Sequence, residues 1–163
     1  LRKVKIKKGD FFYVPSGTIH ALCKGTLVLE TQQNSDTTYR VYDYDRVDNS
    51  GNKRELHVDK SIDVSTVPHK EENSNYTIKE NENYKLTTFV SNDFFSIHKL
   101  DTFGKCNFNQ DKPFTLFSIL DGSGKIVCSN NEYKLNKGDN FILPSGIKTL
   151  SIDGSMEIIC SHI

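Results

Sequence analysis

The stretch that decides the fold of this chain is Gly9-Asp10-Phe11-Phe12-Tyr13-Val14-Pro15-Ser16-Gly17-Thr18-Ile19-His20. Gly9-Asp10 and Pro15-Ser16-Gly17 are typical of tight turns, because glycine tolerates a left-handed backbone and proline fixes φ. The apolar residues between the two turns predict a short buried strand. His20 then opens the next strand, which places it at a fixed point on the wall of a β-barrel.

The same pattern recurs downstream with one change. Residues 6–17 align without gaps with residues 135–146, at an offset of 129 residues, and the register extends to the turn glycines Gly25 and Gly154. Self-similarity of this kind indicates two copies of one supersecondary unit. His20, however, falls opposite Thr149. We therefore expect one copy to carry chemistry and the other to be structural.

The spacing G-x5-P-x-G-x2-H in the first copy resembles the second signature motif of the cupin barrels, in which the histidine commonly points into the barrel and binds a metal. The predicted fold is therefore mainly β, of the cupin-type β-barrel or jelly-roll class. The second half of one barrel would be followed by a complete or nearly complete second barrel. Residues 1–67 would form the C-terminal half of the metal-site barrel, residues 68–75 a linker, and residues 76–163 the second, metal-free barrel.

The two copies differ in what precedes them. Only eight residues stand before Gly9, whereas a long strand-rich segment stands before Gly138. We therefore expect the chain to be the C-terminal fragment of a longer protein whose first barrel lacks its opening half.

Strand signals dominate the chain, because short apolar or alternating runs are separated by Gly, Asn, Asp and Pro. Asp121-Gly122-Ser123-Gly124 predicts a tight hairpin turn between two strands. The predicted helix is Asp59–Val64, with Asp59 as its N-cap. The predicted strands are Val4–Lys7, Phe11–Val14, Thr18–Leu22, Leu27–Thr31, Tyr39–Tyr44, Tyr84–Val90, Phe94–Leu100, Thr115–Leu120, Lys125–Cys128, Phe141–Leu143, Thr149–Ile152 and Met156–Cys160.

Composition narrows the possible partners. The chain has 21 basic and 21 acidic residues and a formal net charge of zero, which argues against nucleic acid or an anionic membrane surface. No apolar run approaches the roughly 18 residues that a membrane-spanning helix needs. The cysteines Cys23, Cys106, Cys128 and Cys160 lack C-x-x-C spacing. Reduced thiols in apolar strands predict a cytoplasmic protein.

A dense polar run from Glu30 to Arg40 carries the second candidate site. Arg40 opens an aromatic strand, and a guanidinium fixed on a strand beside a metal site is suited to holding phosphate or a developing oxyanion. The competing interpretation is an ordinary solvated loop around Asp36, with Arg40 as a strand-edge arginine. The residues alone leave both interpretations open.

The blocks Gly9–Ala21 and Glu30–Asp43 resemble the type I mannose-6-phosphate isomerases in their shorter bacterial form, and the likeness continues through Arg54–His57 into the C-terminal barrel. The resemblance implies an aldose–ketose isomerase that interconverts mannose 6-phosphate and fructose 6-phosphate, with a sugar phosphate as substrate and zinc as cofactor. His20 matches the last of the family's zinc ligands, and Arg40 matches its active-site arginine. The resemblance thus implies that His20 is a metal ligand and Arg40 a catalytic residue.

The family's other zinc ligands are a Gln-x-His pair and a glutamate, and no Gln-x-His occurs in these 163 residues. We therefore expect the missing ligands to lie upstream. The fragment alone is predicted to be inactive, with zinc absent or weakly bound, and the general base is not assigned. Half a barrel exposes unpaired strand edges, which predicts self-association.

Two other function classes stay open. One is a non-catalytic sugar-sensing or structural cupin, in which His20 is a relic. The other is a metal-dependent cupin oxygenase, which would carry a His-x-His pair upstream. The remaining histidines receive no chemical role: His57 is expected at the surface or in support of the site, His69 in the linker and His162 at the terminus. His98 is expected to have no second ligand at metal spacing.

Overall fold

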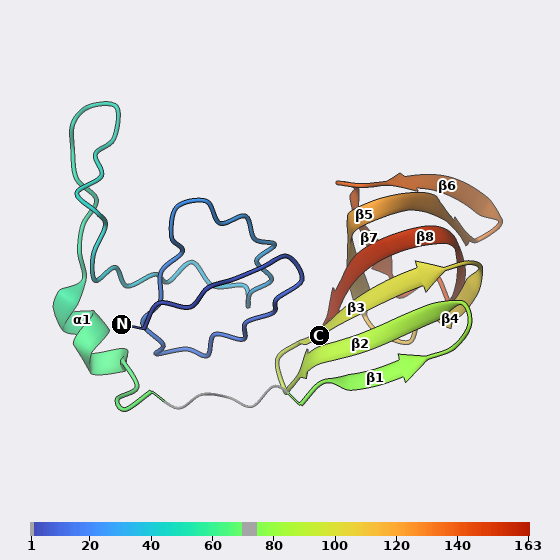
Figure 1. Cartoon of the computed structure of the whole chain (residues 1–163), viewed down its shortest axis with the longest axis horizontal. Helices are drawn as coiled ribbons and strands as arrows, with labels where there is room; N and C mark the ends of the chain where they lie inside the picture. Colours follow the sequence, from blue (N-terminus) through green and yellow to red (C-terminus); the bar gives the residue numbers. More distant parts are fainter. Residues whose placement is uncertain (1, 70–74) are drawn as a thin grey trace. The chain divides into compact units, whose positions relative to one another are not determined.

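The structure, a computed structural model, describes residues 2–69 and 75–163. The chain divides into two compact units, Leu1–Glu72 and Asn73–Ile163 (Figure 1). Most of the predicted linker, residues 70–74, lies outside the described residues. Within the described ranges, no helix is both long enough and apolar enough to cross a membrane.

The second unit is one antiparallel β-sheet, which agrees with the predicted mainly β fold of the cupin type. Its strand order is β1-β2-β3-β8-β5-β6, with β4 paired to β8 and β7 paired to β5. The strands are β1 Thr77–Glu80, β2 Tyr84–Ser91, β3 Ser96–Phe103, β4 Cys106–Asn109, β5 Phe114–Cys128, β6 Asn131–Asn136, β7 Asn140–Pro144 and β8 Thr149–His162.

Two long strands, β5 and β8, form the centre of this sheet. β5 pairs with β7 over residues 114–118 and with β6 over residues 123–128, while β8 runs beside it along most of its length. β8 likewise changes partner, from β4 over residues 149–152 to β3 over residues 155–162. The two halves of β5, like those of β8, thus pair with different strands. Both strands curve along their length (Figure 1).

Glycines permit the curvature of β5 and β8. Gly124 of β5 stands opposite Gly154 of β8. A Cβ atom on Gly154 would lie 2.6 Å from the Gly124 Cα atom, so no larger side chain fits there. The predicted hairpin turn at Asp121–Gly124 is therefore wrong, because these residues lie within β5. Its glycines allow the backbones of β5 and β8 to approach closely, and the chain does not reverse there.

The hydrophobic core lies within the second unit. Alternate residues of β8 point inward, and Ile152 and Ile158 are completely buried. The stacked rings of Phe117 and Phe141, with centroids 4.9 Å apart, lie at the same core. The core residues are Leu100, Cys106, Phe117, Ile119, Ile126, Leu135, Leu143, Leu150, Ile152, Met156, Ile158 and Cys160.

The first unit has little regular structure. It contains α1, Val58–Val64, and an isolated bridge between Val47 and Lys53. The five strands predicted between Val4 and Tyr44 are therefore wrong for these residues, which form no named strand in the part of the chain that the structure describes. A strand needs a ladder of hydrogen bonds to a neighbour, and isolated backbone bonds such as that from the His57 amide to the Arg40 carbonyl do not make one.

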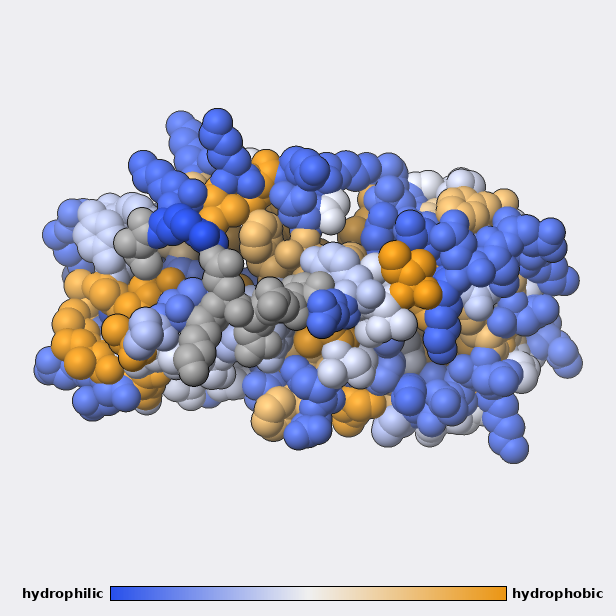
Figure 2. Space-filling view, turned by 60° about the horizontal axis from the view of Figure 1, so that its bottom comes forward, coloured by the Kyte–Doolittle hydropathy of each residue, from blue (hydrophilic) through white to orange (hydrophobic). Residues whose placement is uncertain are grey.

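Apolar side chains of the first unit stay exposed. Its buried residues among those described are the polar Asp43 and Ser61. Leu27 is 98% exposed and Phe12 54% exposed, although both stand in apolar runs that predict burial. Hydrophobic side chains are visible at the molecular surface (Figure 2). The segments of this unit thus have the composition of a barrel wall without its core.

The fold of the second unit predicts a sharp contrast between two isoleucines. Ile158→Ala should lower the free energy of unfolding by about 2–5 kcal/mol, because Ile158 is fully buried and its removal leaves a cavity. Ile142→Ala should cost less than about 1 kcal/mol, because Ile142 is 58% exposed. Urea unfolding of both variants measures this difference. Equal losses would contradict the assigned core.

Candidate functional site

The two turns of the segment Gly9–His20 form as predicted. Gly9 and Gly17 adopt φ angles of 92° and 80°, in the region that favours glycine. The Lys7 amide donates to Asp10 Oδ2 at 2.9 Å, and the Thr18 amide donates to the Pro15 carbonyl at 3.2 Å. These bonds fix the backbone on both sides of the segment.

The second copy of the segment repeats the same turns. The Asn136 amide donates to Asp139 Oδ2 at 2.7 Å, Gly138 has a φ of 94°, and the Ile147 amide donates to the Pro144 carbonyl at 3.3 Å. The turn chemistry is therefore common to both copies. The strands are not, since β7 forms in the second copy alone.

His20 is exposed and held by its own turn. Its Nδ1 lies 2.9 Å from the Thr18 carbonyl oxygen. Because a carbonyl can only accept, Nδ1 carries a proton, and in the neutral ring the lone pair is on Nε2. This is the tautomer that a metal-binding histidine adopts when a backbone carbonyl orients its ring.

Arg40 is half-buried and held from two sides. Its Nη1 donates to the Glu55 carbonyl at 3.1 Å, and its backbone amide donates to His57 Nδ1 at 3.2 Å. The His57 amide donates back to the Arg40 carbonyl at 2.7 Å. His57 thus supports Arg40, one of the two roles expected for it. One N–H group of the Arg40 guanidinium donates to the Glu55 carbonyl, and its other N–H groups can donate to a ligand.

A charged network missed by sequence reasoning braces the segment that follows Arg40. Asp43 is 6% exposed and binds both Arg46 and Arg54, with Arg54 Nε 2.7 Å from its Oδ2. The hydrogen bond from Arg54, then that from Arg46, lowers the pKa of Asp43 to about 2. Asp43 therefore stays ionised at neutral pH. The signal available in the sequence was an acid in an aromatic run, three residues before an arginine.

Helix α1 docks against the turn that precedes His20. The Thr66 amide, two residues beyond the helix end, donates to the Gly17 carbonyl at 3.0 Å. The helix confirms the predicted Asp59–Val64 within one residue, but its N-cap is His57, without a side-chain capping bond. Residues far apart in sequence thus meet behind the segment that carries His20.

His20 and Arg40 have different local partners: Thr18 for the first, Glu55 and His57 for the second. Within residues 2–69 and 75–163, no group of three or more His, Cys, Asp or Glu side chains is placed to hold a metal ion. His20 therefore offers one donor of the three or four that zinc requires.

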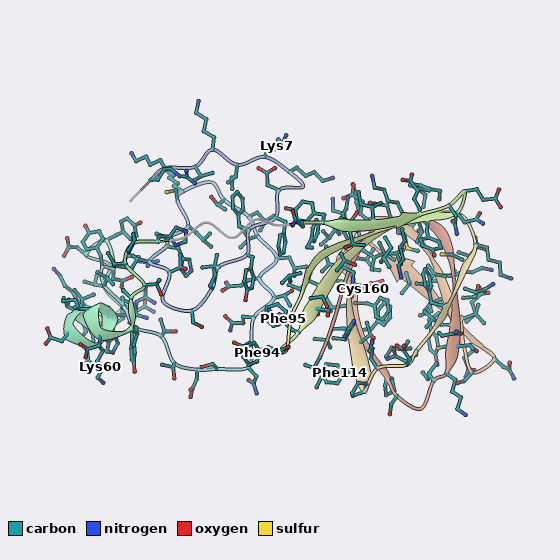
Figure 3. The ribbon with its side chains drawn as sticks, turned by 90° about the horizontal axis from the view of Figure 1, so that it is seen from below. Lys7, Lys60, Phe94, Phe95, Phe114 and Cys160 are labelled. Carbon is teal, nitrogen blue, oxygen red and sulfur yellow. The ribbon has the colours of Figure 1, made fainter. Side chains whose placement is uncertain are left out.

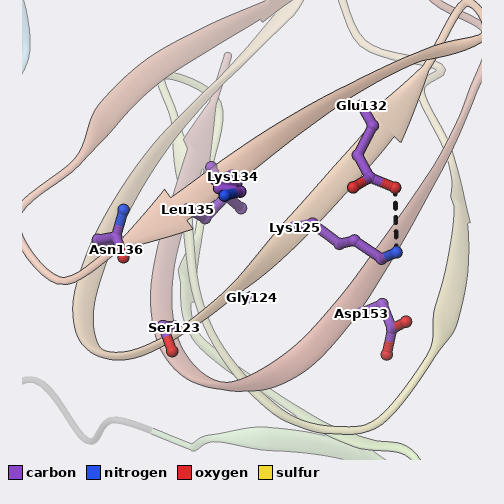
Figure 4. Close-up of a pocket in the computed structure, with 8 residues that line it drawn as sticks. All are labelled: Ser123, Gly124, Lys125, Glu132, Lys134, Leu135, Asn136 and Asp153. Carbon is purple, nitrogen blue, oxygen red and sulfur yellow. Dashed lines mark hydrogen bonds and ion pairs between the residues drawn. The ribbon is translucent and has the colours of Figure 1, made fainter.

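The second unit has a concave surface along the β5–β6 hairpin. It encloses about 420 Å³ and is open to solvent. Lys125 Nζ and Glu132 Oε2 form an ion pair of 3.0 Å on its wall, with Asp153 nearby (Figure 4). Glu132 raises the pKa of Lys125 through this hydrogen bond. Its lining holds two basic and two acidic side chains, so it offers no net charge to a ligand.

The second unit also brings together two histidines, which corrects the prediction that His98 stands alone. His98 Nε2 lies 3.1 Å from His162 Nε2. Burial, followed by the charges of His162, Lys112 and Lys79, lowers the pKa of His98 to about 4. The pair lies near the start of β3 and the end of β8, the end of the sheet where Figure 3 labels Phe95 and Phe114.

The second unit has the cupin-type fold that the repeated motif predicts. Residues 85–163 match the family model described as "Mannose-6-phosphate isomerase, cupin domain". The chain is 47% identical to the mannose-6-phosphate isomerase ManA of Bacillus subtilis, over 100% of the chain and 52% of that protein. It is 48% identical to the mannose-6-phosphate isomerase of Streptococcus mutans, over 99% of the chain and 51% of that protein.

A solved structure agrees with these relatives. The crystal structure of the mannose 6-phosphate isomerase from Bacillus subtilis superimposes with a TM-score of 0.94 and 48% identity, over 98% of this chain and 51% of that one. These matches confirm the resemblance to the mannose-6-phosphate isomerases, and residues 85–163 match the model of the isomerase cupin domain. The chain spans about half the length of the curated relatives it matches.

Two glycine variants test how α1 supports the His20 turn. A Cβ atom on Gly17 would lie 2.7 Å from the Val64 carbonyl oxygen, whereas one on Gly9 would meet nothing within 4 Å. Both Gly17→Ala and Gly9→Ala should pay the cost of a left-handed backbone, about 1–3 kcal/mol. Gly17→Ala alone should also free the Thr66 amide, whose hydrogen exchange by NMR should accelerate. Unchanged Thr66 exchange in Gly17→Ala would contradict the docking of α1.

Proposed function

We propose that this chain is the C-terminal part of a zinc-dependent aldose–ketose isomerase that interconverts mannose 6-phosphate and fructose 6-phosphate. The observation that carries the proposal is the identity of 47–48% to mannose-6-phosphate isomerases over a matched span that contains His20 and Arg40. The share of those relatives that the chain covers, about half, supports a division of the active site between this chain and polypeptide outside it.

His20 is the proposed zinc ligand of this chain. Its Nε2 lone pair is free, and the Thr18 carbonyl holds the ring by its other nitrogen. Zinc takes a neutral imidazole at about 2.0–2.1 Å, and a catalytic site needs about three protein ligands. The other ligands would come from outside the chain. When bound, the zinc ion would act as a Lewis acid toward the sugar oxygens.

Arg40 is the proposed catalytic residue. Its guanidinium is charged at every physiological pH, and the Glu55 carbonyl and His57 fix its position. The free N–H groups can donate to a phosphate or to the oxygen that gains negative charge as a proton moves between C1 and C2 of the sugar. Such a donor acts on charge that develops during the reaction rather than on metal binding.

The exposed apolar side chains of the first unit support the same division. Leu27, Val28 and Leu29 form a run that is 98%, 47% and 48% exposed. Burying such a run stabilises a protein by roughly 25 cal/mol for each Å² of apolar surface. We propose that the chain by itself binds zinc weakly, lacks isomerase activity and self-associates through this unit. In the isomerase, the missing half of the barrel would cover these residues.

Reconstitution tests the proposal. The chain, co-expressed with the half of the Bacillus subtilis isomerase that it does not match, should gain zinc and turnover of mannose 6-phosphate. His20→Ala should abolish both. Arg40→Ala should keep zinc and lower kcat by about 10²–10³. A coupled isomerase assay beside zinc analysis measures these outcomes.

The controls separate this function from its alternative. His69→Ala, at a histidine with no proposed role, should keep zinc and turnover, and Arg40→Lys should restore little of the loss because lysine lacks the planar fork. Full turnover by Arg40→Ala, or turnover by the chain alone, would contradict the assignment. Zinc binding without turnover in the reconstituted protein would favour a non-catalytic sugar-sensing or structural cupin.

A further inference from the structure

His98 and His162 lie on the same face of two paired strands. The register pairs His98 of β3 with Cys160 of β8, and Ser96 with His162, so that the two histidines are diagonal neighbours. Their rings are stacked, with centroids 5.2 Å apart and an interplanar angle of 27°. The two Nε2 atoms face each other at 3.1 Å.

The other nitrogen of each ring has a partner of its own. His98 Nδ1 lies 2.9 Å from Thr88 Oγ1, and His162 Nδ1 lies 3.1 Å from the main-chain oxygen of Ile163. That oxygen can only accept, so His162 carries its proton on Nδ1 and presents an Nε2 lone pair. His98 then donates through Nε2–H to His162 and accepts at Nδ1 from the Thr88 hydroxyl.

We propose that His98 and His162 form a binding site for a divalent transition-metal ion such as Ni²⁺, in the second unit and independent of His20. Imidazole suits Ni²⁺, Cu²⁺ and Zn²⁺. Two imidazole nitrogens at about 2.0–2.1 Å from one ion lie roughly 2.9–3.4 Å apart for ligand angles between square and tetrahedral. The observed separation of 3.1 Å falls within that span.

Metal binding here requires a change of tautomer but no loss of a proton. The proton on His98 Nε2 moves to Nδ1, where Thr88 Oγ1 turns from donor into acceptor. Both Nε2 atoms then carry a lone pair available to an ion, toward which the stacked rings would turn. Thr88 and the Ile163 oxygen hold the rings in the manner of the hydrogen-bond partners that orient metal-binding histidines.

The surroundings set the strength of this site. Lys79 and Lys112 are near enough to act electrostatically on His98, and their positive charge opposes any cation. With two protein ligands, water would fill the other positions around the ion. We therefore expect reversible binding that a chelator removes, in contrast to a closed structural site.

A titration of the 163-residue chain with NiCl₂ tests the proposal, in a Cys23→Ser background because Cys23 is an exposed thiol. NMR of the imidazole rings should show paramagnetic broadening centred on His98 and His162, and EDTA should reverse it. His98→Ala and His162→Ala should each abolish this broadening at the remaining ring. His20→Ala should leave it unchanged, so the result does not depend on the proposed isomerase function.

A second variant keeps the test independent of folding defects. Thr88→Val retains both ligands but removes the hydroxyl, and it should weaken Ni²⁺ binding about 10–100-fold. Far-UV circular dichroism confirms the fold of each variant. Broadening that persists at His162 in the folded His98→Ala protein would overturn the proposal. So would the absence of broadening at both rings in the protein with the intact pair.

Discussion

The structure depends on one constraint: a β-strand buries its apolar face and satisfies its backbone only beside other strands. The second unit meets this constraint. β5 and β8 pair along most of their length, and each has a further strand on its other edge. Their contact explains the position of Ile152 and Ile158, which are completely buried. The first unit does not meet the constraint, although its sequence repeats the turns of the second.

This difference determines how the candidate residues are held. His20 and Arg40 are held by a few hydrogen bonds. His20 bonds to the Thr18 carbonyl, and Arg40 bonds to the Glu55 carbonyl and to His57. Such hydrogen bonds orient an imidazole ring or a guanidinium, but they do not bring several metal ligands together. Assembly requires ligands from several strands at once. This geometry supports the proposal that His20 and Arg40 belong to an active site completed by groups outside the chain.

The sequence predicted the features that depend on neighbouring residues. The turns at Gly9 and Gly17, helix α1 and strand β2 all follow from local propensity and spacing. It failed where distant segments decide the outcome. Asp121–Gly124 has the composition of a hairpin turn, but contact with Gly154 keeps it within β5. His98 and His162 are 64 residues apart, and only the β3–β8 register brings them together. The bond from Arg54 to Asp43, across eleven residues, could not be read from spacing either.

Hydrogen–deuterium exchange of the 163-residue chain, followed by mass spectrometry, tests most directly the claim that the first unit lacks its ladder partners. Peptides from β5 and β8 should exchange slowly, since their amides are paired on the sheet, whereas peptides from residues 4–44 should exchange at nearly the rate of an unstructured chain. Addition of the unmatched half of the Bacillus subtilis isomerase should then slow exchange within residues 4–44 alone. Slow exchange of residues 4–44 in the unassembled chain, equal to that of β5 and β8, would contradict the account.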